Sequence, residues 1–306
     1  MTLRVVAAVL VTACTAAAVA CSPGSPAAGP GSASPAATPV ATTAPEARAT
    51  SAVPASGPDH VVIVMLENKN EADVLREGPY LASLAASGAT LTDMHAETHP
   101  SQPNYLALFS GDTQGVDDDR CPLTFDAPNL ATELAAAGHS FAGYSEDLPE
   151  VGFTGCRAGA YARKHSPWTD FSTVPPAANQ PLSAMPADYA ALPTISFVIP
   201  NLCHDMHDCS IAQGDAWLRQ NIDGYAQWAR THNSLLIVSF DESESNRDQD
   251  NHIATLAVGQ RVPVGPIPQH TDHYGLLRTL EDLYGLPSLG HSAQAVAVAG
   301  LWRTGS

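Results

Sequence analysis

Positive charge is scarce in this sequence. Its 306 residues include 14 lysines and arginines against 31 aspartates and glutamates, which gives a formal net charge of −17 at pH 7. A field of this sign repels polyphosphate backbones and anionic lipid surfaces. The charge balance therefore argues against nucleic-acid binding and against electrostatic adsorption to a membrane.

Long hydrophobic runs are also lacking. The apolar stretch Val5–Ala20 is too short for a stable membrane span. It follows Arg4 and ends at small residues and Cys21, the pattern of an export signal, so we expect residues 1–21 to form a signal peptide. The run Ala18–Cys21 resembles a bacterial lipoprotein cleavage box without its usual leucine. Cys21 is either lipidated, as a membrane anchor, or lost to ordinary cleavage nearby; both alternatives predict a protein that is secreted or held on the outer face of the membrane.

Aromatic residues are absent from residues 22–58. This stretch consists mainly of Pro, Ala, Ser, Thr and Gly, a composition that cannot bury a core. We expect a disordered, flexible linker here. Residues 59–306 then form the folded part, and a length of about 250 residues suits one domain.

Cysteine is sparse beyond the signal, where four remain: Cys121, Cys156, Cys203 and Cys209. An even number in an exported protein favours disulfides, and the spacing suggests Cys203 with Cys209 and Cys121 with Cys156. A zinc site made by Cys203, His204, His207 and Cys209 is the alternative. The short intervals and the oxidising compartment argue against zinc there.

Two apolar runs end in carboxylates. Val61–Leu66 stops at Glu67–Asn68, and Leu235–Phe240 stops at Asp241–Glu242. Such short runs, rich in β-branched residues, are typical of strands buried in a parallel sheet, and ligands bind at the carboxyl ends of such strands. If the strands are parallel neighbours, three carboxylates and an amide meet and need a cation between them. Oxygen ligands favour one divalent ion such as Ca²⁺, Mg²⁺ or Mn²⁺ over Zn²⁺.

Strand and helix patterns alternate through most of the domain. We expect further strands over residues 89–94, 141–144, 194–199 and 252–258, and helices over residues 80–86, 129–137, 213–230 and 273–284. The stretch Ser145–Ala191 has weak periodicity and many Pro, Gly and aromatic residues, so we expect an ordered insertion at the rim of the site. The fold class is α/β, with a mostly parallel sheet sandwiched between helices.

Ser101 is the candidate nucleophile. It lies where the segment His99–Leu108 turns into a helix; Ser101 suits the N-cap and Pro103 the first turn. A helix N-terminus favours an anion. A serine hydroxyl attacks phosphorus only if a base or a metal activates it. The alternatives are that Ser101 is only a cap, or that Thr98 is the nucleophile.

Three of the twelve histidines are candidates for phosphate chemistry. His207 lies between two cysteines just after a strand, where it can bind phosphate oxygen or protonate a leaving group. His273 opens a helix, and His252 begins a strand beside the acidic loop Ser243–Asn251. His207 and His273 each have a structural alternative, as a buried loop histidine and as a cap, respectively.

These residues together resemble the bacterial phosphoesterase family, which joins secreted acid phosphatases with non-haemolytic phospholipases C. Its fold is related to alkaline phosphatase. The resemblance rests on five blocks in order: Glu67–Asn68, His99–Leu108, Pro200–Asp208, Phe240–Glu242 and His273–Asp282.

The resemblance implies a metal site and a covalent phosphoenzyme. By analogy one divalent ion is held by Glu67, Asn68, Ser101, Asp241 and Glu242. Ser101 would be the nucleophile and His207 would contact the phosphoryl group. Asn104, His252 and His273 would be substrate-binding residues. Related phospholipases continue after the acidic pair with a Gly-rich stretch and a histidine, which this chain lacks, so the role of His252 stays open.

We therefore expect an exported, metal-dependent phosphomonoesterase of the acid phosphatase type that acts on small phosphate esters. One alternative is a phospholipase C, with an apolar entry built from Phe153, Tyr161, Trp168 and Phe171. Another is a lipid-anchored protein that binds phosphate or a cation without turnover.

Overall fold

The computed structural model of the protein describes residues 57–244 and 250–303. The expected signal peptide, Cys21, nearly all of the expected linker and part of the acidic loop lie outside the described residues. The described part begins within the expected linker, and the Pro58 carbonyl accepts a hydrogen bond from Tyr284 Oη at 2.8 Å. No helix in the described ranges is long and apolar enough to cross a membrane.

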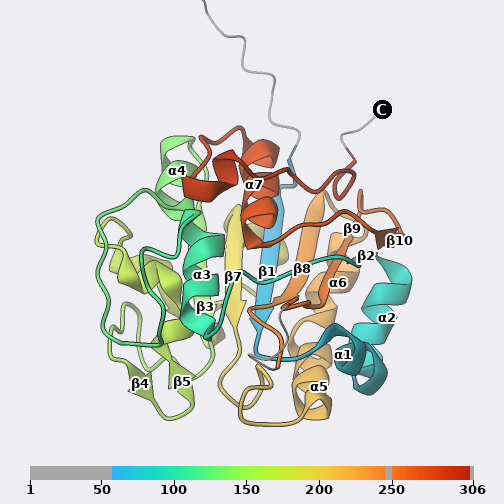
Figure 1. Ribbon diagram of the computed structural model, residues 1–306, viewed down its shortest axis with the longest axis horizontal. Coiled ribbons are helices and arrows are strands. Elements are labelled where there is room, and N and C mark those ends of the chain that lie inside the picture. The colour runs from blue at the N-terminus through green and yellow to red at the C-terminus, as the bar shows by residue number, and fades with distance from the viewer. Residues whose placement is uncertain (1–56, 245–249, 304–306) are drawn as a thin grey trace, which may run out of the picture. The chain divides into compact units, whose positions relative to one another are not determined.

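An eight-stranded sheet forms the centre of the described chain (Figure 1). Its strands, in spatial order, are β10 (Gly265–Ile267), β2 (Ala89–Leu91), β9 (Thr255–Gly259), β8 (Ser234–Phe240), β1 (His60–Leu66), β7 (Ile195–Ile199), β3 (Phe141–Ser145) and β6 (Asn179–Pro181). β1 is parallel to both of its neighbours, β7 and β8. Its residues from Val61 to Leu66 are inaccessible to solvent, which explains why the sequence reads as a continuous apolar run.

Only β9 runs against its neighbours in this sheet; it is antiparallel to β8 and to β2. Among the described residues no helix lies between β8 and β9, and a parallel pair needs a crossover long enough to return the chain to the other end. The expected α/β class with a mostly parallel sheet is confirmed.

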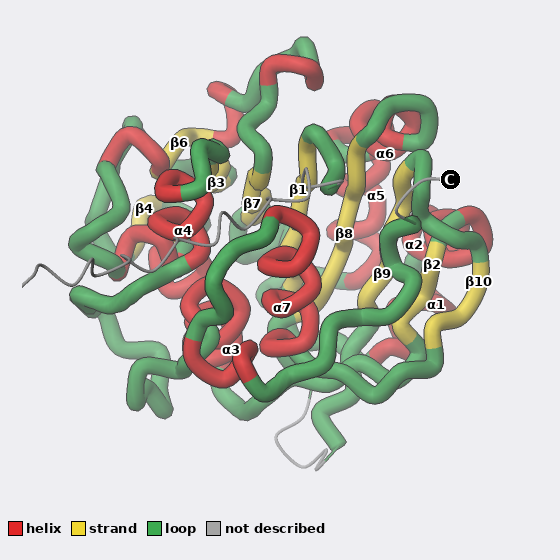
Figure 2. Tube along the Cα trace, turned by 90° about the horizontal axis from the view of Figure 1, so that it is seen from above, coloured by secondary structure: helices red, strands yellow, loops and turns green. Residues whose placement is uncertain are grey.

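Helices cover both faces of the sheet (Figure 2). α3 (Ser101–Ser110) and α7 (His273–Tyr284) lie side by side on one face, while α2 (Pro79–Ser87), α5 (Ile211–Asn221) and α6 (Asp223–Ala229) lie on the other. α1 (Glu71–Glu77) and α4 (Leu130–Ala136) complete the α-helices of the described ranges. In α7, Leu276 and Leu280 are buried one turn apart, so this helix packs by its apolar stripe as its sequence predicts.

Several expected element boundaries are wrong. The single helix expected over residues 213–230 is two helices, α5 and α6, which meet at Ile222. The strand expected over residues 89–94 ends at Leu91, and that expected over 252–258 begins at Thr255. In both cases the remaining residues pair through isolated bridges: Met94 with Thr271, His95 with His252 and Asn70 with Ile253.

The segment Ser145–Ala191 is ordered, as expected. It contains the two-stranded β4 (Arg157–Ala158) and β5 (Tyr161–Ala162), the strand β6 and five short 3₁₀ helices, η1 (Arg163–His165), η2 (Pro167–Asp170), η3 (Pro176–Ala178), η4 (Leu182–Ala184) and η5 (Tyr189–Ala191). Both expected disulfides are present, Cys121 with Cys156 and Cys203 with Cys209. The zinc alternative for the second pair is therefore wrong.

Candidate active site

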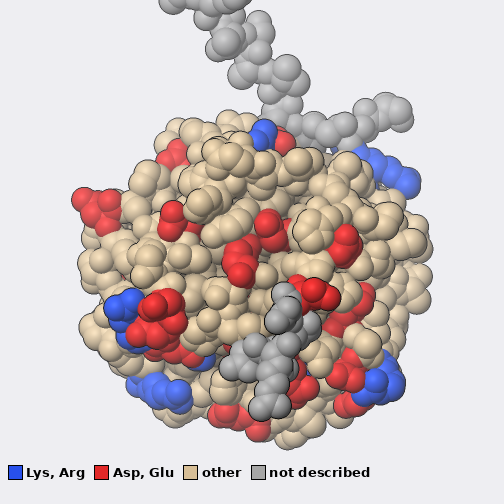
Figure 3. All heavy atoms as spheres, viewed as in Figure 1, with Lys and Arg blue, Asp and Glu red and all other residues tan. Residues whose placement is uncertain are grey.

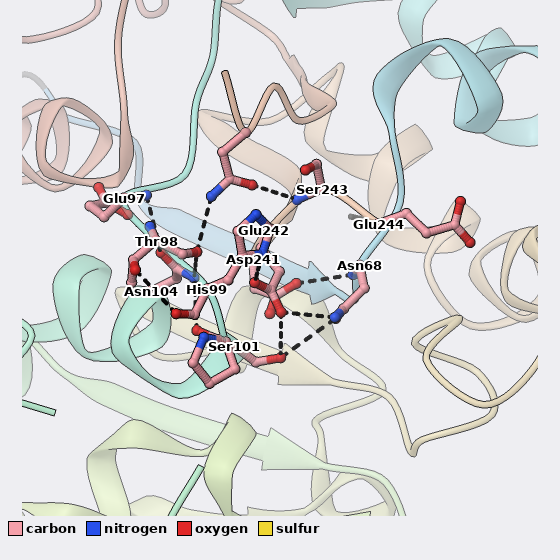
Figure 4. Close-up of polar contacts among 12 residues, drawn as sticks. Asn68, Glu97, Thr98, His99, Ser101, Asn104, Asp241, Glu242, Ser243 and Glu244 are labelled. Carbon is pink, nitrogen blue, oxygen red and sulfur yellow. Dashed lines mark hydrogen bonds and ion pairs between the residues drawn. The ribbon is translucent and has the colours of Figure 1, made fainter. Parts of the chain in front are cut away.

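The two carboxylate-ended strands meet as the sequence predicts. Leu66 lies opposite Phe240 in the β1–β8 register, so the residues that follow emerge level with each other. The backbone N–H of Asn68 donates to Asp241 Oδ1 at 3.1 Å, and its carboxamide donates to Glu242 Oε1 at 2.8 Å (Figure 4). The ends of neighbouring parallel strands thus place these side chains in one cluster.

Ser101 points into this cluster from the start of α3. Its Oγ lies 2.9 Å from Glu67 Oε2, 3.2 Å from Glu242 Oε1 and 3.5 Å from Asn68 Oδ1. The expected N-cap role is wrong, because Pro100 holds the N-cap position and Ser101 is the first helical residue. The hydroxyl of Ser101 therefore meets carboxylates instead of capping its own helix.

The carboxylates are crowded and shielded from water. Glu67, Asp241 and Glu242 are buried. Burial, together with the neighbouring Asp241 carboxylate, raises the pKa of Glu67 to about 8. Burial and the Glu67 carboxylate raise the pKa of Glu242 to about 8, and burial and Glu242 raise the pKa of Asp241 well above its ordinary value. These shifts are those expected where like charges are buried without enough positive charge nearby.

One oxygen of the cluster lacks a partner. Asp241 Oδ2 is buried and accepts no hydrogen bond from the described residues. Buried carboxylate oxygens are normally paired, and each exception calls for an explanation such as an ion. The donor set of carboxylate, carboxamide and hydroxyl oxygens matches the ligands that hard divalent cations take. The residues present therefore fit a metal ion bound among Glu67, Asn68, Ser101, Asp241 and Glu242.

Asn104 braces the turn before Ser101. Its Oδ1 accepts the backbone N–H groups of Glu97 and Thr98 at 3.1 and 3.0 Å, and its Nδ2 donates to the carbonyls of Thr98 and Pro100 at 2.8 and 3.3 Å. Both hydrogens of the amide are therefore engaged by backbone (Figure 4). This geometry does not support a direct contact with phosphate and makes Asn104 a residue that positions the segment before Ser101.

His207 lies on the loop closed by Cys203 and Cys209. Its Nδ1 lies 2.7 Å from Asp208 Oδ1, and its backbone N–H donates to Asp205 Oδ1 at 2.8 Å. The imidazole is partly exposed, and its ring centre is 6.5 Å from that of His165. The Asp208 contact leaves Nε2 as the nitrogen available to a substrate.

The other two predicted histidines lie elsewhere. His273 is buried, with Nδ1 2.6 Å from Glu97 Oε2 and Nε2 3.0 Å from the Phe240 carbonyl. Both nitrogens are therefore engaged. The ring of His252 lies 5.2 Å from that of His95, with Nε2 3.2 Å from the Thr92 carbonyl. Neither placement supports the predicted contact with phosphate.

The structure also places residues in the site that the sequence did not single out. His165 lies with Nε2 3.0 Å from Glu67 Oε1 and Nδ1 3.3 Å from Asp205 Oδ2. Burial lowers its pKa to about 4, although Glu67 opposes this shift. Tyr105 stacks on the His165 ring and donates its hydroxyl to Glu67 Oε1. No periodic pattern marks His165, whereas Tyr105 is found by counting one helical turn from Ser101.

Lys164 brings positive charge towards the cluster. Burial lowers its pKa, but the Glu67 and Asp119 carboxylates outweigh burial and the net shift is upward. Its Nζ lies 2.7 Å from Asp119 Oδ2, while Asp119 Oδ1 accepts the backbone N–H of Gln102 at 3.1 Å. The first turn of α3 is thus tied to this ammonium group. On the face seen in Figure 3, Asp and Glu side chains occupy the centre and Lys and Arg lie towards the edge.

Known proteins share this sequence and fold. The profile of the Phosphoesterase family matches residues 75–287. A phosphatidylinositol-3-phosphatase of Mycobacterium tuberculosis is 49% identical over 248 residues, which cover 79% of this chain and 82% of that protein. A phosphate-repressible acid phosphatase of Penicillium chrysogenum is 32% identical over 76% of this chain and 60% of its own length.

Solved structures agree on the fold. A lipoteichoic acid synthase of Listeria monocytogenes, LtaP, superposes with a TM-score of 0.53 at 10% identity, over 83% of this chain and 76% of that one. A member of the alkaline phosphatase superfamily from Vibrio parahaemolyticus superposes with a TM-score of 0.50 at 11% identity, over 80% and 72%. The reaction is inferred from the family profile and the named phosphatases, and the solved structures support the fold alone. The chain belongs to the phosphoesterase family and is an enzyme that hydrolyses phosphate esters.

Proposed function

We propose that the protein is an exported, metal-dependent phosphomonoesterase of the acid phosphatase type, which works through a phosphoserine at Ser101. The observation that carries this proposal is the position of Ser101 Oγ, 2.9 and 3.2 Å from two buried carboxylates. Export is supported by the two disulfides, which persist in oxidising compartments.

Metal dependence is supported by the buried charge. Three carboxylates without a matching cation are costly to bury, and Asp241 Oδ2 lacks a hydrogen-bond partner among the described residues. The Ser101 hydroxyl oxygen lies 2.9 Å from Glu67 Oε2 and 3.2 Å from Glu242 Oε1. Such separations are typical of neighbouring oxygen ligands of one ion with bonds of about 2.0–2.6 Å. When bound, such an ion lowers the pKa of the serine hydroxyl and neutralises charge on the phosphoryl oxygens.

The residues of the chain divide the first chemical step between them. Ser101 gives up its hydroxyl proton to solvent, and Glu67 Oε2 at 2.9 Å holds the serine oxygen in position. Its Oγ forms a bond to phosphorus while the bond from phosphorus to the ester oxygen breaks. His207 Nε2 protonates the departing oxygen, since its Nδ1 is held by Asp208. Lys164 adds positive charge on the side of the cluster that faces the start of α3.

The second step reverses these roles. His207 Nε2 takes a proton from a water molecule, and the resulting hydroxide attacks phosphorus. The bond between Ser101 Oγ and phosphorus breaks, inorganic phosphate leaves, and Ser101 recovers its proton. In the transition state, negative charge is spread over the phosphoryl oxygens. It is stabilised by groups that are already in position before the reaction and need not reorganise.

A phosphomonoester is the substrate class that the relatives favour. The mycobacterial relative is named for phosphate removal from a phosphoinositide and the fungal ones for acid phosphatase activity. The apolar entry that a phospholipase C would need is poorly supported. Tyr161, Trp168 and Phe171 are buried, and the cavity that Trp168 and Phe171 line also presents the polar side chains of Arg163, Asp170 and Asn179. We therefore place monoesters, with soluble or lipid alcohols, before phosphodiesters.

Ser101→Ala tests the nucleophile. We expect turnover of a phosphomonoester to fall by about 10⁴-fold or more, since the covalent route is lost. The matched control is Ser110→Ala on the same helix, where the hydroxyl donates to the Leu106 carbonyl. Acid-quenched enzyme should carry a phosphate on Ser101, detectable by mass spectrometry. Turnover at the wild-type rate in Ser101→Ala would overturn the proposal, and phosphate binding without turnover in the wild type would favour the binding-protein alternative.

Removal of metal tests the cation. Dialysis against a chelator should abolish turnover and lower the melting temperature, because the carboxylates then repel one another. Ca²⁺, Mg²⁺ or Mn²⁺ should restore both. Comparison of p-nitrophenyl phosphate, a short-chain phosphatidylinositol 3-phosphate and phosphatidylcholine then ranks the substrates. A higher rate on phosphatidylcholine than on either monoester would instead establish the phospholipase C alternative.

A further inference from the structure

A second group of metal-ligating side chains lies apart from the proposed catalytic residues. It consists of Asp93, His95 and His270, and one ligand atom from each lies within 4.8 Å of the others. His95 Nε2 is 2.7 Å from Asp93 Oδ1, and His270 Nδ1 is 3.3 Å from Asp93 Oδ2. The ring centres of the two histidines are 4.8 Å apart. The mechanism above uses none of these three residues.

Backbone hydrogen bonds hold Asp93 and His95 against Thr271, the residue that follows His270. The N–H of His95 donates to the Thr271 carbonyl at 2.9 Å, and the N–H of Thr271 donates to the Asp93 carbonyl at 3.0 Å. This pairing continues the contact between β2 and β10 beyond the ends of both strands. A site built on paired backbone needs little ordering when it binds an ion, which favours affinity.

The hydrogen bonding of His95 fixes which nitrogen faces the carboxylate. Its Nδ1 contacts the backbone carbonyl of Asp250, and a carbonyl oxygen only accepts, so Nδ1 carries the hydrogen. The other nitrogen, Nε2, then points at Asp93 Oδ1. A lone pair opposite a carboxylate oxygen requires a proton or a metal ion between them. A metal-binding histidine has this same arrangement, in which the second nitrogen donates to a carbonyl.

We propose that Asp93, His95 and His270 bind a divalent transition-metal ion of the Zn²⁺ class. Two imidazole nitrogens and one carboxylate oxygen form a three-ligand set, and water completes the coordination. The donor set differs from the oxygen ligands around Ser101, so the two sites select different ions. Access is open, because the His270 side chain is 76% exposed and that of Asp93 43%.

The proposed site lies on the segment that leads to the nucleophile. After His95, the N–H of Ala96 donates to the Asn251 carbonyl at 2.9 Å, and Asn251 Nδ2 donates to the Thr98 carbonyl at 3.0 Å. An ion that joins Asp93 and His95 to His270 therefore fixes the first part of the segment that leads to Ser101. Asn104 braces the last part of the same segment. We assign it a stabilising role and no step of the reaction.

Titration of the full domain with ZnCl₂ tests the proposal. The enzyme is first saturated with the ion that restores turnover, and binding is followed by calorimetry and by melting temperature at pH 7.5. We expect one further equivalent of Zn²⁺ to bind and to raise the melting temperature. His270→Ala should raise the dissociation constant at least 10-fold and remove the shift in melting temperature. This side chain is exposed, so the variant is expected to fold.

Two control variants separate the two sites. His291→Ala removes another exposed histidine, 62% accessible and outside the group, and should bind Zn²⁺ as the wild type does. Glu242→Gln removes a proposed ligand of the catalytic ion and should keep the second Zn²⁺ equivalent. Zn²⁺ binding that is unchanged in His270→Ala, or lost only in Glu242→Gln, would overturn the proposal. Absence of a further equivalent in the wild type would leave the group as an ion-paired surface cluster and would equally overturn it.

Discussion

The carboxamide of Asn68 donates to Glu242 Oε1 at 2.8 Å, across the ends of two adjacent parallel strands. Asn68 also has a backbone φ of 44°, in the left-handed region, which asparagine tolerates better than most residues and glycine tolerates best. The residue therefore has two separable roles. Its backbone turns the chain out of β1, and its side chain orients a carboxylate of the proposed metal site.

Asn68→Gly and Asn68→Ala should separate these roles. Both lose the carboxamide, so we expect kcat/KM to fall by about 10- to 100-fold in both, together with metal affinity. Alanine is also less favourable than glycine at a positive φ. The unfolding free energy of Asn68→Ala should therefore be about 1 kcal/mol lower than that of Asn68→Gly. Steady-state kinetics and thermal unfolding measure the two effects. Near-normal activity in Asn68→Gly would show that the side chain does not orient Glu242 for catalysis.

His207→Ala tests the proton donor through the choice of leaving group. An alkoxide needs a proton as it departs, whereas p-nitrophenolate leaves readily without one. We expect kcat/KM, which reports the steps up to formation of the phosphoserine, to fall by about 100-fold on an alkyl phosphate and by less than about 10-fold on p-nitrophenyl phosphate.

His204→Ala is the matched control, since this histidine lies on the same disulfide-closed loop with Nδ1 at 2.9 Å from Glu146. It should leave both rates nearly unchanged. Equal losses of kcat/KM on the two esters in His207→Ala would instead indicate a role in binding phosphate and not in protonation of the leaving group.

The two disulfides should differ in what their removal damages. Cys203 and Cys209 are six residues apart, and Cys121 and Cys156 are 35 apart. In the chain-entropy account, loops of these lengths contribute about 2 and about 4 kcal/mol to unfolding free energy. The short loop, however, carries His207. Replacing both cysteines of a pair with serine should therefore lower activity more for the short loop and stability more for the long one. Denaturant unfolding measures the stability of the two double variants, and kcat/KM measures their activity. If the same double variant were the more impaired in both measurements, the prediction would be contradicted.

The carboxylate cluster could be predicted from the sequence because its cause is local. A buried parallel strand is a continuous apolar run, and the first polar residues after it must emerge at the sheet edge. Glu67 and Asp241 follow such runs, so only the adjacency of the two strands had to be assumed, and the structure confirms it. Ser101 was found for a similar reason, since a Ser before a Pro-containing apolar segment marks the start of a helix.

The surroundings of the cluster could not be predicted because they depend on distant packing. His165 reaches Glu67 from an insertion without periodicity, so no pattern distinguishes it from the other histidines. His252 and His273 are near the right strands in the sequence, but a few residues of loop decide which way each side chain points. The structure directs His273 to Glu97 and His252 towards His95. A position beside a catalytic segment is therefore weak evidence for a catalytic side chain.

His273 gives the protein a pH-dependent stability. Its two nitrogens face two acceptors, Glu97 Oε2 and the Phe240 carbonyl, so the ring donates twice only when it is protonated. Burial lowers its pKa, but the Glu97 carboxylate and these hydrogen bonds outweigh burial and hold the pKa above 6.5. Asp272, the N-cap of α7, also raises it. Between 6.5 and the folded pKa, the folded state therefore binds more protons than the unfolded state.

The sign of the effect follows from this difference. Stability from His273 is fully present below about pH 6.5 and is lost as the pH rises through the folded pKa, with a slope of at most about 1.4 kcal/mol per pH unit. His273→Gln keeps one donor and does not titrate, so its unfolding free energy should change less between pH 6.5 and 9 than that of the wild type. His232→Gln, at an exposed position, should retain the wild-type slope. Denaturant unfolding at several pH values gives the slope of unfolding free energy against pH for the wild type and both variants. The loss of stability with rising pH requires a proton that only the folded state holds. Equal slopes in wild type and His273→Gln would therefore exclude a protonated His273 as the origin of that loss.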